Sequence, residues 1–235
     1  MRRAIKTSVK LFSENFKSLG PVVEIGSFYM PNYEKLCDLR PFFKGLEYIG
    51  CDIRKGPGVD RIEDAQALRF SECSVGTLIM LEILEHLPDP HKSISEAHRV
   101  LRDDGLLVIS VPFNLRLHGF PSDYWRFTAS GIHMLLSDFQ DKIIFSLGPK
   151  MKPAFVFAVA TKVSTYRFTE EKERFAKRIE QYFRGSFARG YISVLKERGK
   201  DFFGHIIGRA SISVDFFDKS KDKFYDTSWH NERNK

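Results

Sequence analysis

Three short segments of the chain each place a glycine or a carboxylate at or just after an expected strand. Gly26 ends the strand expected at 22–26, Asp52 ends the one expected at 46–52, and Asp64 comes after a short third at 59–62. A glycine lets a ligand approach the backbone closely, and a carboxylate at a strand tip can accept both hydroxyls of a ribose. An acidic side chain in the third position could read an adenine edge. Together with Glu24, these residues predict a nucleoside site.

Further along the chain, three polar residues have side chains that could take up a proton. His86, His118 and Asp123 lie in segments that follow expected strands. A histidine near its ordinary pKa can act as a general base, so we regard all three as catalytic candidates. For His86, a role limited to hydrogen bonding the backbone is an equal alternative.

The segment at 118–128 mixes charged and aromatic side chains, which favours a lid over a polar ligand. Tyr124 and Arg126 are its candidate substrate-binding residues. An arginine can bind a carboxylate or phosphate through two parallel hydrogen bonds. A structural ion pair is the equal alternative for Arg126, and a packed anchor is the alternative for Tyr124.

Strands and helices must alternate to bring these residues together. Apolar runs predict strands at 22–26, 46–52, 59–62, 77–81, 106–111, 142–147 and 154–162. Helices are expected at 4–18, at 90–102 after the capping residue Asp89, and at 128–139. This alternation predicts an α/β fold, a Rossmann-like, doubly wound sheet of seven mostly parallel strands.

The alternation ends near residue 163. We therefore expect one Rossmann-like domain at 1–163, with its N-terminal helix within 1–18, and a C-terminal extension at 164–235. The extension contains 14 of the 32 aromatic residues and 16 Lys and Arg against 11 Asp and Glu. It should be mainly helical and packed, with Phe175, Ile179, Tyr182 and Phe183 on one helix face, and disordered only in its last residues.

Composition excludes several classes of protein. No stretch approaches the roughly 18 apolar residues of a membrane span, and no apolar signal-peptide core follows the charged start. We expect a cytoplasmic protein. Its three cysteines have neither metal nor paired-cysteine spacing, so no metal site is expected. The basic extension leaves peripheral membrane contact open, and the oligomeric state stays open too.

Several runs of the sequence resemble class I S-adenosylmethionine-dependent methyltransferases of the "type 11" group. They are Glu24-Ile25-Gly26-Ser27 and the stretches at 48–53, 81–90 and 96–107. The stretch at 118–128 is similar to a subset encoded among bacterial surface-glycan biosynthesis genes. The resemblance covers about residues 20–162 and leaves out the extension.

This resemblance implies S-adenosylmethionine as cofactor and assigns roles by position. Gly26 and Ser27 would lie against the methionine moiety, Asp52 would hold the ribose, and the adenine would contact Ile53, Asp64 and Ala65. Leu81 and Glu82 would lie below the methyl-transfer site, and His86 would face the substrate. The implied activity is methyl transfer to a small-molecule or sugar acceptor, at oxygen or nitrogen.

Two other functions remain open from the sequence. Phe28 and Met30 stand where this family usually has glycines, so a degenerate binding domain without catalysis is one alternative. The isoelectric point of 9.2 suggests a nucleic-acid methyltransferase, but the sequence lacks the usual base-methylating motif after the fourth strand. A nicotinamide dehydrogenase is disfavoured because Gly-x-Gly-x-x-Gly is absent.

Overall fold

The computed structural model describes residues 3–118, 122–149, 152–197 and 212–216. Its helices and 3₁₀ turns (η) are α1 (Arg3–Asn15), α2 (Glu34–Cys37), η1 (Arg40–Phe42), η2 (Leu84–His86), α3 (Pro90–Val100), α4 (Ala129–Leu135) and α5 (Tyr166–Glu197). The strands are β1 (Val22–Ile25), β2 (Tyr48–Asp52), β3 (Arg61–Ile62), β4 (Val75–Leu81), β5 (Leu101–Pro112), β6 (Asp141–Pro149), β7 (Phe155–Thr161) and β8 (Ile212–Phe216).

All the strands form one sheet in the order β3-β2-β1-β4-β5-β7-β6-β8. The pairs from β3 to β5 are parallel, and those of β7 with β5 and β6 are antiparallel. The chain runs outward from β1 to β3 and then returns to β4 on the other side of β1. The order therefore reverses between β1 and β4, which is where doubly wound sheets bind ligands.

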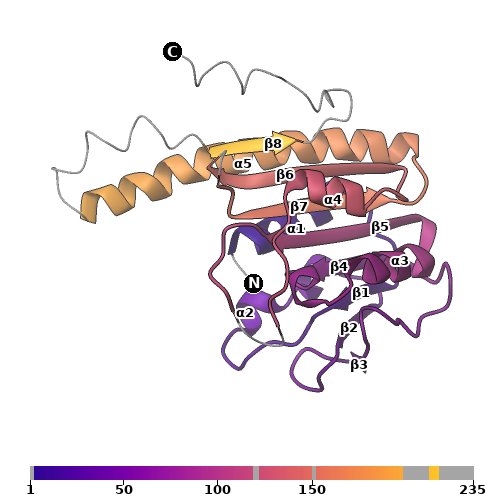
Figure 1. Cartoon of the computed structure of the whole chain (residues 1–235). Helices are drawn as coiled ribbons and strands as arrows, with labels where there is room; N and C mark the ends of the chain where they lie inside the picture. Colours follow the sequence, from indigo (N-terminus) through magenta and orange to yellow (C-terminus); the bar gives the residue numbers. More distant parts are fainter. Residues whose placement is uncertain (1–2, 119–121, 150–151, 198–211, 217–235) are drawn as a thin grey trace, which may run out of the picture.

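Helices cover both faces of the sheet (Figure 1). On one face α3 and α4 pack against the strands through Ile94, Ala97 and Ile132. On the other face α1 and α5 contribute Val9, Phe12 and Phe175, among others. Because both faces are covered, β4 is an almost uninterrupted buried strand, as expected for the centre of a parallel sheet. The Rossmann-like fold with its mostly parallel sheet is thus confirmed.

Most boundaries agree with the sequence prediction, but α1, α3 and α4 all end earlier than predicted, α1 at Asn15 and not at residue 18. α3 begins after Asp89, whose side chain accepts a hydrogen bond from the Lys92 amide at 3.0 Å. It ends at Val100 because Leu101 already pairs with Val75 as the start of β5. α4 ends at Leu135, and the apolar residues after it are buried in the turns that lead to β6.

The extension begins with α5, which starts at Tyr166, three residues before the helix that the sequence predicts at 169–183. Phe175, Ile179 and Phe183 are buried against α1 and the sheet, with the Phe175 ring 5.5 Å from that of Phe16. Tyr182 is 45% exposed, so its placement on the buried face was wrong. It lies one helical position away from that face. The helical start of the extension is confirmed, while its division from the domain at residue 163 stays a prediction.

An eighth strand was not predicted from the sequence. β8 pairs antiparallel with β6 and extends the predicted seven strands by one at the sheet edge. The expected disorder of the last residues falls outside the described residues. None of the described helices is both long and apolar enough to cross a membrane.

Candidate functional site

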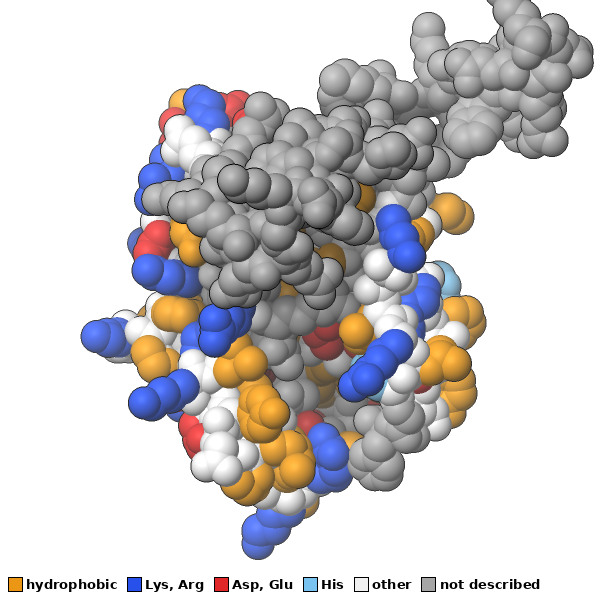
Figure 2. Space-filling view, turned by 90° about the vertical axis from the view of Figure 1, so that its left-hand side faces the viewer, with side chains coloured by type: hydrophobic (Ala, Val, Ile, Leu, Met, Phe, Trp, Pro, Cys, Tyr) orange, Lys and Arg blue, Asp and Glu red, His pale blue; other side chains and the backbone are white. Residues whose placement is uncertain are grey.

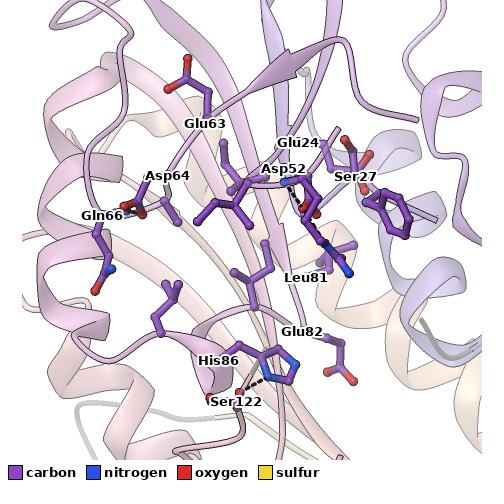
Figure 3. A pocket seen from close by; sticks show the side chains of 18 of the residues that line it. Glu24, Ser27, Asp52, Glu63, Asp64, Gln66, Leu81, Glu82, His86 and Ser122 are labelled. Atoms are coloured by element: carbon purple, nitrogen blue, oxygen red, sulfur yellow. Dashed lines mark hydrogen bonds and ion pairs between the residues drawn. The ribbon is translucent and has the colours of Figure 1, made fainter. Parts of the chain in front are cut away.

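A cavity of about 540 Å³ opens beyond the carboxyl ends of β1, β2 and β4, within the roughly 300–1,000 Å³ of small-molecule sites. Figure 2 views the molecule from the side of α2 and shows acidic side chains in a recess. In Figure 3, Ser27 and Asp52 lie on one side of the cavity, and Glu82 and His86 on the opposite side. We call these sides the β1–β2 end (Gly26, Ser27, Asp52, Ile53, Asp64, Ala65) and the histidine end (Glu82, Glu85, His86, His118, Asp123).

The turn after β1 depends on Gly26. Its φ of +85° lies in the left-handed region that glycine tolerates best. A Cβ added there would lie 2.6 Å from Cδ1 of Ile83, so a side chain would force Ile83 to move. The Gly26 and Ser27 amides both donate hydrogen bonds to the carbonyl of Cys51, at 2.7 and 2.9 Å. These bonds hold the turn against the end of β2.

Asp52 is a buried carboxylate at the tip of β2, and it lines the cavity. Its Oδ1 accepts hydrogen bonds from the backbone amide of Arg54 at 2.9 Å and from Arg54 Nε at 3.2 Å. Ile53 is 64% exposed beside it and gives the cavity an apolar rim. This combination of a fixed carboxylate and an apolar surface suits a sugar joined to a flat ring.

The third strand tip brings Asp64 and Ala65 to the same end of the cavity. Asp64 Oδ1 accepts a hydrogen bond from the Gln66 amide at 2.8 Å, which closes a tight turn. The preceding Glu63 is buried and accepts a hydrogen bond from the Arg69 amide at 2.9 Å. The sequence analysis did not select Glu63 or Gln66, although both line the cavity.

Phe28 and Met30 do not fill the site. The Arg54 guanidinium lies 4.3 Å from the centre of the Phe28 ring, which also packs against Gly56. A Cβ on Gly56 would lie 2.4 Å from that ring. Met30 is 62% exposed and is not a lining residue. Phe28 thus forms part of the cavity wall with its ring held against Arg54 and Gly56, and Met30 lies outside the lining.

Glu82 occupies the tip of β4 in a left-handed conformation, with a φ of +55°. Non-glycine residues in that region are strained by roughly 1–2 kcal/mol, and such strain clusters at functional sites. The Glu82 amide donates to the Ser110 carbonyl at 2.9 Å, which holds this conformation. Leu81 and Glu82 both line the cavity, which reaches from the β1–β2 end to the histidine end.

A buried glutamate lies beneath the β1–β2 end. Burial raises the pKa of Glu24 to about 7, against the opposing effect of a hydrogen bond that Tyr48 Oη donates to its Oε2 at 2.6 Å. The same burial raises the pKa of the Tyr48 hydroxyl. Glu24 lines the cavity floor, so its charge responds to whatever the cavity holds.

The described lining of the cavity is strongly acidic. It contains five carboxylates (Glu24, Asp52, Glu63, Asp64 and Glu82) and, as basic side chains, Arg54 and His86. An acidic cleft attracts cations and repels pyrophosphates. The electrostatics therefore favour a positively charged ligand over a dinucleotide.

At the histidine end, η2 and the residues at 113–118 and 122–128 bring the side chains of His86, His118 and Asp123 together. The imidazole rings of His86 and His118 lie 4.7 Å apart, nearly perpendicular. Nδ1 of His86 hydrogen bonds to the Ser122 carbonyl (Figure 3), and Nδ1 of His118 lies 3.2 Å from Asp123 Oδ2. Of the three catalytic candidates, only His86 lines the cavity. The structure thus joins all three in one cluster beside it.

Glu85 lies at the centre of this cluster and was missed from the sequence. Its side chain is fully buried, and burial raises the pKa of its carboxyl to about 8. Its backbone carbonyl accepts hydrogen bonds from the amides of Tyr124 and Trp125, at 2.7 and 3.3 Å. The sequence shows that an acidic residue directly precedes His86, which could have made Glu85 a candidate. Nothing in the sequence indicates that its side chain is buried.

Arg126 is held by other groups of the chain. It forms a two-point ion pair with Asp123, in which Nη2 lies 2.7 Å from Oδ2, and it donates to three backbone carbonyls of the same segment. This pair lowers the pKa of Asp123 well below its usual range. The geometry favours the structural ion pair that the sequence left open. Tyr124 is 54% exposed and lines the cavity rim.

Part of the chain matches a known protein family, and its fold matches several solved structures. Residues 44–109 match the family described as methyltransferase domain. No protein with a curated description matches the sequence. A possible histamine N-methyltransferase from Thermotoga maritima shares the fold with a TM-score of 0.52 and 17% identity, over 67% of this chain and 89% of that one.

Two further solved structures agree with this result. A SAM-dependent methyltransferase from Archaeoglobus fulgidus has a TM-score of 0.51 and 16% identity, over 69% of this chain and 95% of that one. A 1,6-didemethyltoxoflavin N1-methyltransferase from Burkholderia thailandensis has a TM-score of 0.51 and 19% identity, over 69% and 79% of the two chains. The latter structure contains S-adenosylhomocysteine.

Residues 44–109 match the methyltransferase family and the fold is shared with S-adenosylmethionine-dependent methyltransferases, so this cofactor is the one to compare with the cavity. The cavity fits this cofactor on its own evidence. The turn at Gly26 has no room for a side chain, and Ile53 offers an apolar surface to a flat base. The excess of carboxylates matches a ligand that carries a sulfonium and an ammonium group.

Proposed function

We propose that the β1–β2 end binds the adenosine part of S-adenosylmethionine and that methyl transfer takes place between Glu82 and His86. The observation that carries this proposal is the cavity itself. Gly26, Asp52 and Asp64 come from three different strand tips and line one end of it, and the other end is open toward a polar cluster. Bound there, the cofactor supplies an electrophilic methyl group on sulfur.

In this proposal each residue of the β1–β2 end has one task. Gly26 lets the cofactor approach the backbone, and Asp52 accepts hydrogen bonds from the ribose hydroxyls. Ile53 and Ala65 enclose the base, with Asp64 at its polar edge. Support for these tasks comes from the burial of Asp52 and from the orientation of both carboxylates, because Asp52 and Asp64 each accept a hydrogen bond from the backbone amide two residues later.

We further propose a small molecule or a sugar as the methyl acceptor, modified at oxygen or nitrogen. The cavity volume of about 540 Å³ suits an acceptor of this size beside the cofactor, with His86, Pro88 and Tyr124 lining the histidine end. A direct displacement at the methyl carbon needs the acceptor held in line with sulfur, and positioning supplies much of the acceleration. Glycan biosynthesis as the biological setting rests only on the resemblance of the segment at 118–128.

The acceptor loses a proton as it is methylated, and the candidates to handle that proton are His86, His118 and Asp123. His86 reaches the cavity. Asp123 is tied to Arg126 and faces His118, so it orients that ring. We therefore propose that His86 and His118 act at the reacting atom and that Asp123 positions them.

Titration calorimetry with S-adenosylmethionine and S-adenosylhomocysteine tests the proposal. The wild-type chain should bind both with micromolar affinity, and Asp52→Ala should weaken binding about tenfold or more, because it removes charge-assisted hydrogen bonds. Asp103→Ala is the matched control, since the Asp103 side chain is 76% exposed. It lies near the amino end of β5, whereas the cavity lies beyond the carboxyl ends of the strands. If the wild-type chain binds neither nucleoside, or if both variants bind equally well, the proposal is wrong.

A further inference from the structure

Glu85 has an environment that an ionised carboxylate does not tolerate unaided. Its side chain is 0% exposed, and neither carboxylate oxygen accepts a hydrogen bond from another described residue. Burying such a group without partners is costly, and native proteins nearly always satisfy buried polar groups. The two histidine rings lie nearest to Oε1, so a group placed between them and Oε1 would supply a partner.

Both histidines turn their second nitrogen toward that carboxylate. Oε1 of Glu85 lies 3.8 Å from Nε2 of His86 and 4.0 Å from Nε2 of His118. These separations are too long for hydrogen bonds. A proton on one ring could satisfy the carboxylate only from that ring, whereas an ion between the three atoms would contact all of them.

The other nitrogen of each ring is already oriented. Nδ1 of His86 donates to the Ser122 carbonyl, and Nδ1 of His118 faces Asp123, which Arg126 holds in place. Metal-binding histidines have this arrangement, in which a carbonyl or carboxylate fixes one nitrogen and leaves the lone pair of the other for the ion.

The spacing also suits a metal ion. The three ligand atoms, one from each of Glu85, His86 and His118, all lie within 4.8 Å of one another. Metal–ligand bonds of about 2.0–2.2 Å in a tetrahedral site put neighbouring ligand atoms about 3.4 Å apart. Side-chain movements of less than about 1 Å would bring the three atoms to that spacing.

We propose that Glu85, His86 and His118 bind a divalent transition-metal ion of the zinc type at the histidine end. Two imidazoles and one carboxylate are a known ligand set for catalytic zinc and for iron(II). Magnesium and calcium prefer all-oxygen sites and fit this set poorly. The expectation of no metal site was based on cysteine spacing, which carries no information about this cluster.

Three protein ligands leave one coordination position open. If the proposed methyl transfer is right, that position takes the acceptor's oxygen or nitrogen and lowers its pKa, so that His86 and His118 act on the acceptor through the ion and not as bases. The acceptor's proton then goes to solvent, its lone pair forms the bond to the methyl carbon, and the broken carbon–sulfur bond leaves its electron pair on sulfur. This role rests on the proposed function, whereas binding of the ion does not.

Metal binding is measured on the full chain without cofactor or acceptor. After chelation and buffer exchange, zinc should bind with one equivalent per chain and raise Tm by about 5 °C at saturating concentration. The same concentration of magnesium should not change Tm. His118→Ala should lose the bound equivalent and the Tm rise, and so should Glu85→Gln, which keeps the shape of the side chain but removes its charge.

His91→Ala is the matched control, because His91 is exposed on α3 and should leave zinc binding unchanged. Circular dichroism of the metal-free variants checks that they fold. If the wild-type chain takes up no zinc, or if folded His118→Ala and Glu85→Gln bind it as the wild type does, the proposal is wrong. Zinc bound with the predicted losses, in a chain that binds no S-adenosylmethionine, would support the metal site and reject the proposed function alone.

Discussion

A buried glutamate lies at each end of the cavity, and the two carboxylates differ in the hydrogen bonds they receive. At the β1–β2 end, Glu24 receives a hydrogen bond from Tyr48 and belongs to a regular strand. At the histidine end, Glu85 lies in a single 3₁₀ turn and receives none from another described residue. The first carboxylate is satisfied within the chain, and the second is not.

This difference separates a site built on strands from one built on turns. The β1–β2 end is fixed by parallel pairing of β1 with β2 and β4, so its geometry is set before any ligand arrives. The histidine end is held by Tyr124 and Trp125 amides on one carbonyl and by the Asp123–Arg126 pair. We infer that the first end selects its ligand by shape and charge, and that the second needs an ion to become complete.

The largest expected effect is on the free energy of unfolding and comes from replacing Glu24. It tests how far the hydrogen bond from Tyr48 offsets the cost of burying the Glu24 carboxylate. Its pKa is about 7 in the folded chain against an ordinary 4.5. The folded state therefore binds the proton more tightly, and stability falls as pH rises from 4.5 through 7. At pH 8 the free energy of unfolding of Glu24→Gln should exceed that of the wild type by about 3 kcal/mol. At pH 5 the difference should be less than about 1 kcal/mol.

Urea unfolding across this pH range measures the difference. Glu47→Gln is the control, because Glu47 is exposed near the start of β2. This substitution removes one carboxylate and leaves every buried carboxylate in place. A Glu24→Gln variant whose stability advantage does not depend on pH would show that Glu24 stays ionised at all these pH values.

A smaller effect is expected from Arg126→Ala at the histidine end. The change leaves the buried Asp123 carboxylate without its two-point partner, and hydrogen bonds to charged groups are worth about 2 kcal/mol. The free energy of unfolding should fall by that amount, with cofactor affinity nearly unchanged because Arg126 does not line the cavity.

Arg116→Ala provides the comparison for this loss. Arg116 is an exposed residue of the same segment, so its removal should change stability by less than about 0.5 kcal/mol. Equal stabilities of the two variants, or a selective loss of cofactor affinity in Arg126→Ala, would contradict the structural role of the ion pair.

The smallest expected effect separates backbone strain from crowding at the β1–β2 end. Gly26 and Gly45 have φ values of +85° and +80°, but a Cβ on Gly45 meets no atom within 4 Å. Each alanine variant should lose about 1 kcal/mol of stability through its left-handed backbone. Gly26→Ala alone should also weaken S-adenosylhomocysteine binding, about tenfold in calorimetry. Equal affinities would mean that the turn at Gly26 does not approach the cofactor.

The β1–β2 end could be predicted from the sequence because strand tips follow from local patterns. An apolar run that ends in glycine or aspartate gives both the strand and the residue at its tip, as at Gly26 and Asp52. Parallel pairing then brings such tips to one edge of the sheet. Each of the nine residues selected for the cofactor lines the cavity, while their individual contacts with it stay predictions.

The histidine end could be predicted only in part. His86, His118 and Asp123 were selected for their chemistry, but their cluster depends on the irregular segment at 113–128, whose path has no periodic pattern. Glu85 shows the limit most clearly, because burial of an acidic residue in a 3₁₀ turn contradicts its polarity. β8 was missed for a related reason, since an edge strand forms through a distant partner, β6.

A crystal structure of the chain with S-adenosylhomocysteine tests the central claim most directly. We predict that both ribose hydroxyls bind Asp52, that the adenine lies between Ile53 and Ala65, and that the sulfur points toward Glu82 and His86. A nucleoside bound elsewhere, or bound in the cavity with its ribose away from Asp52, would contradict the account.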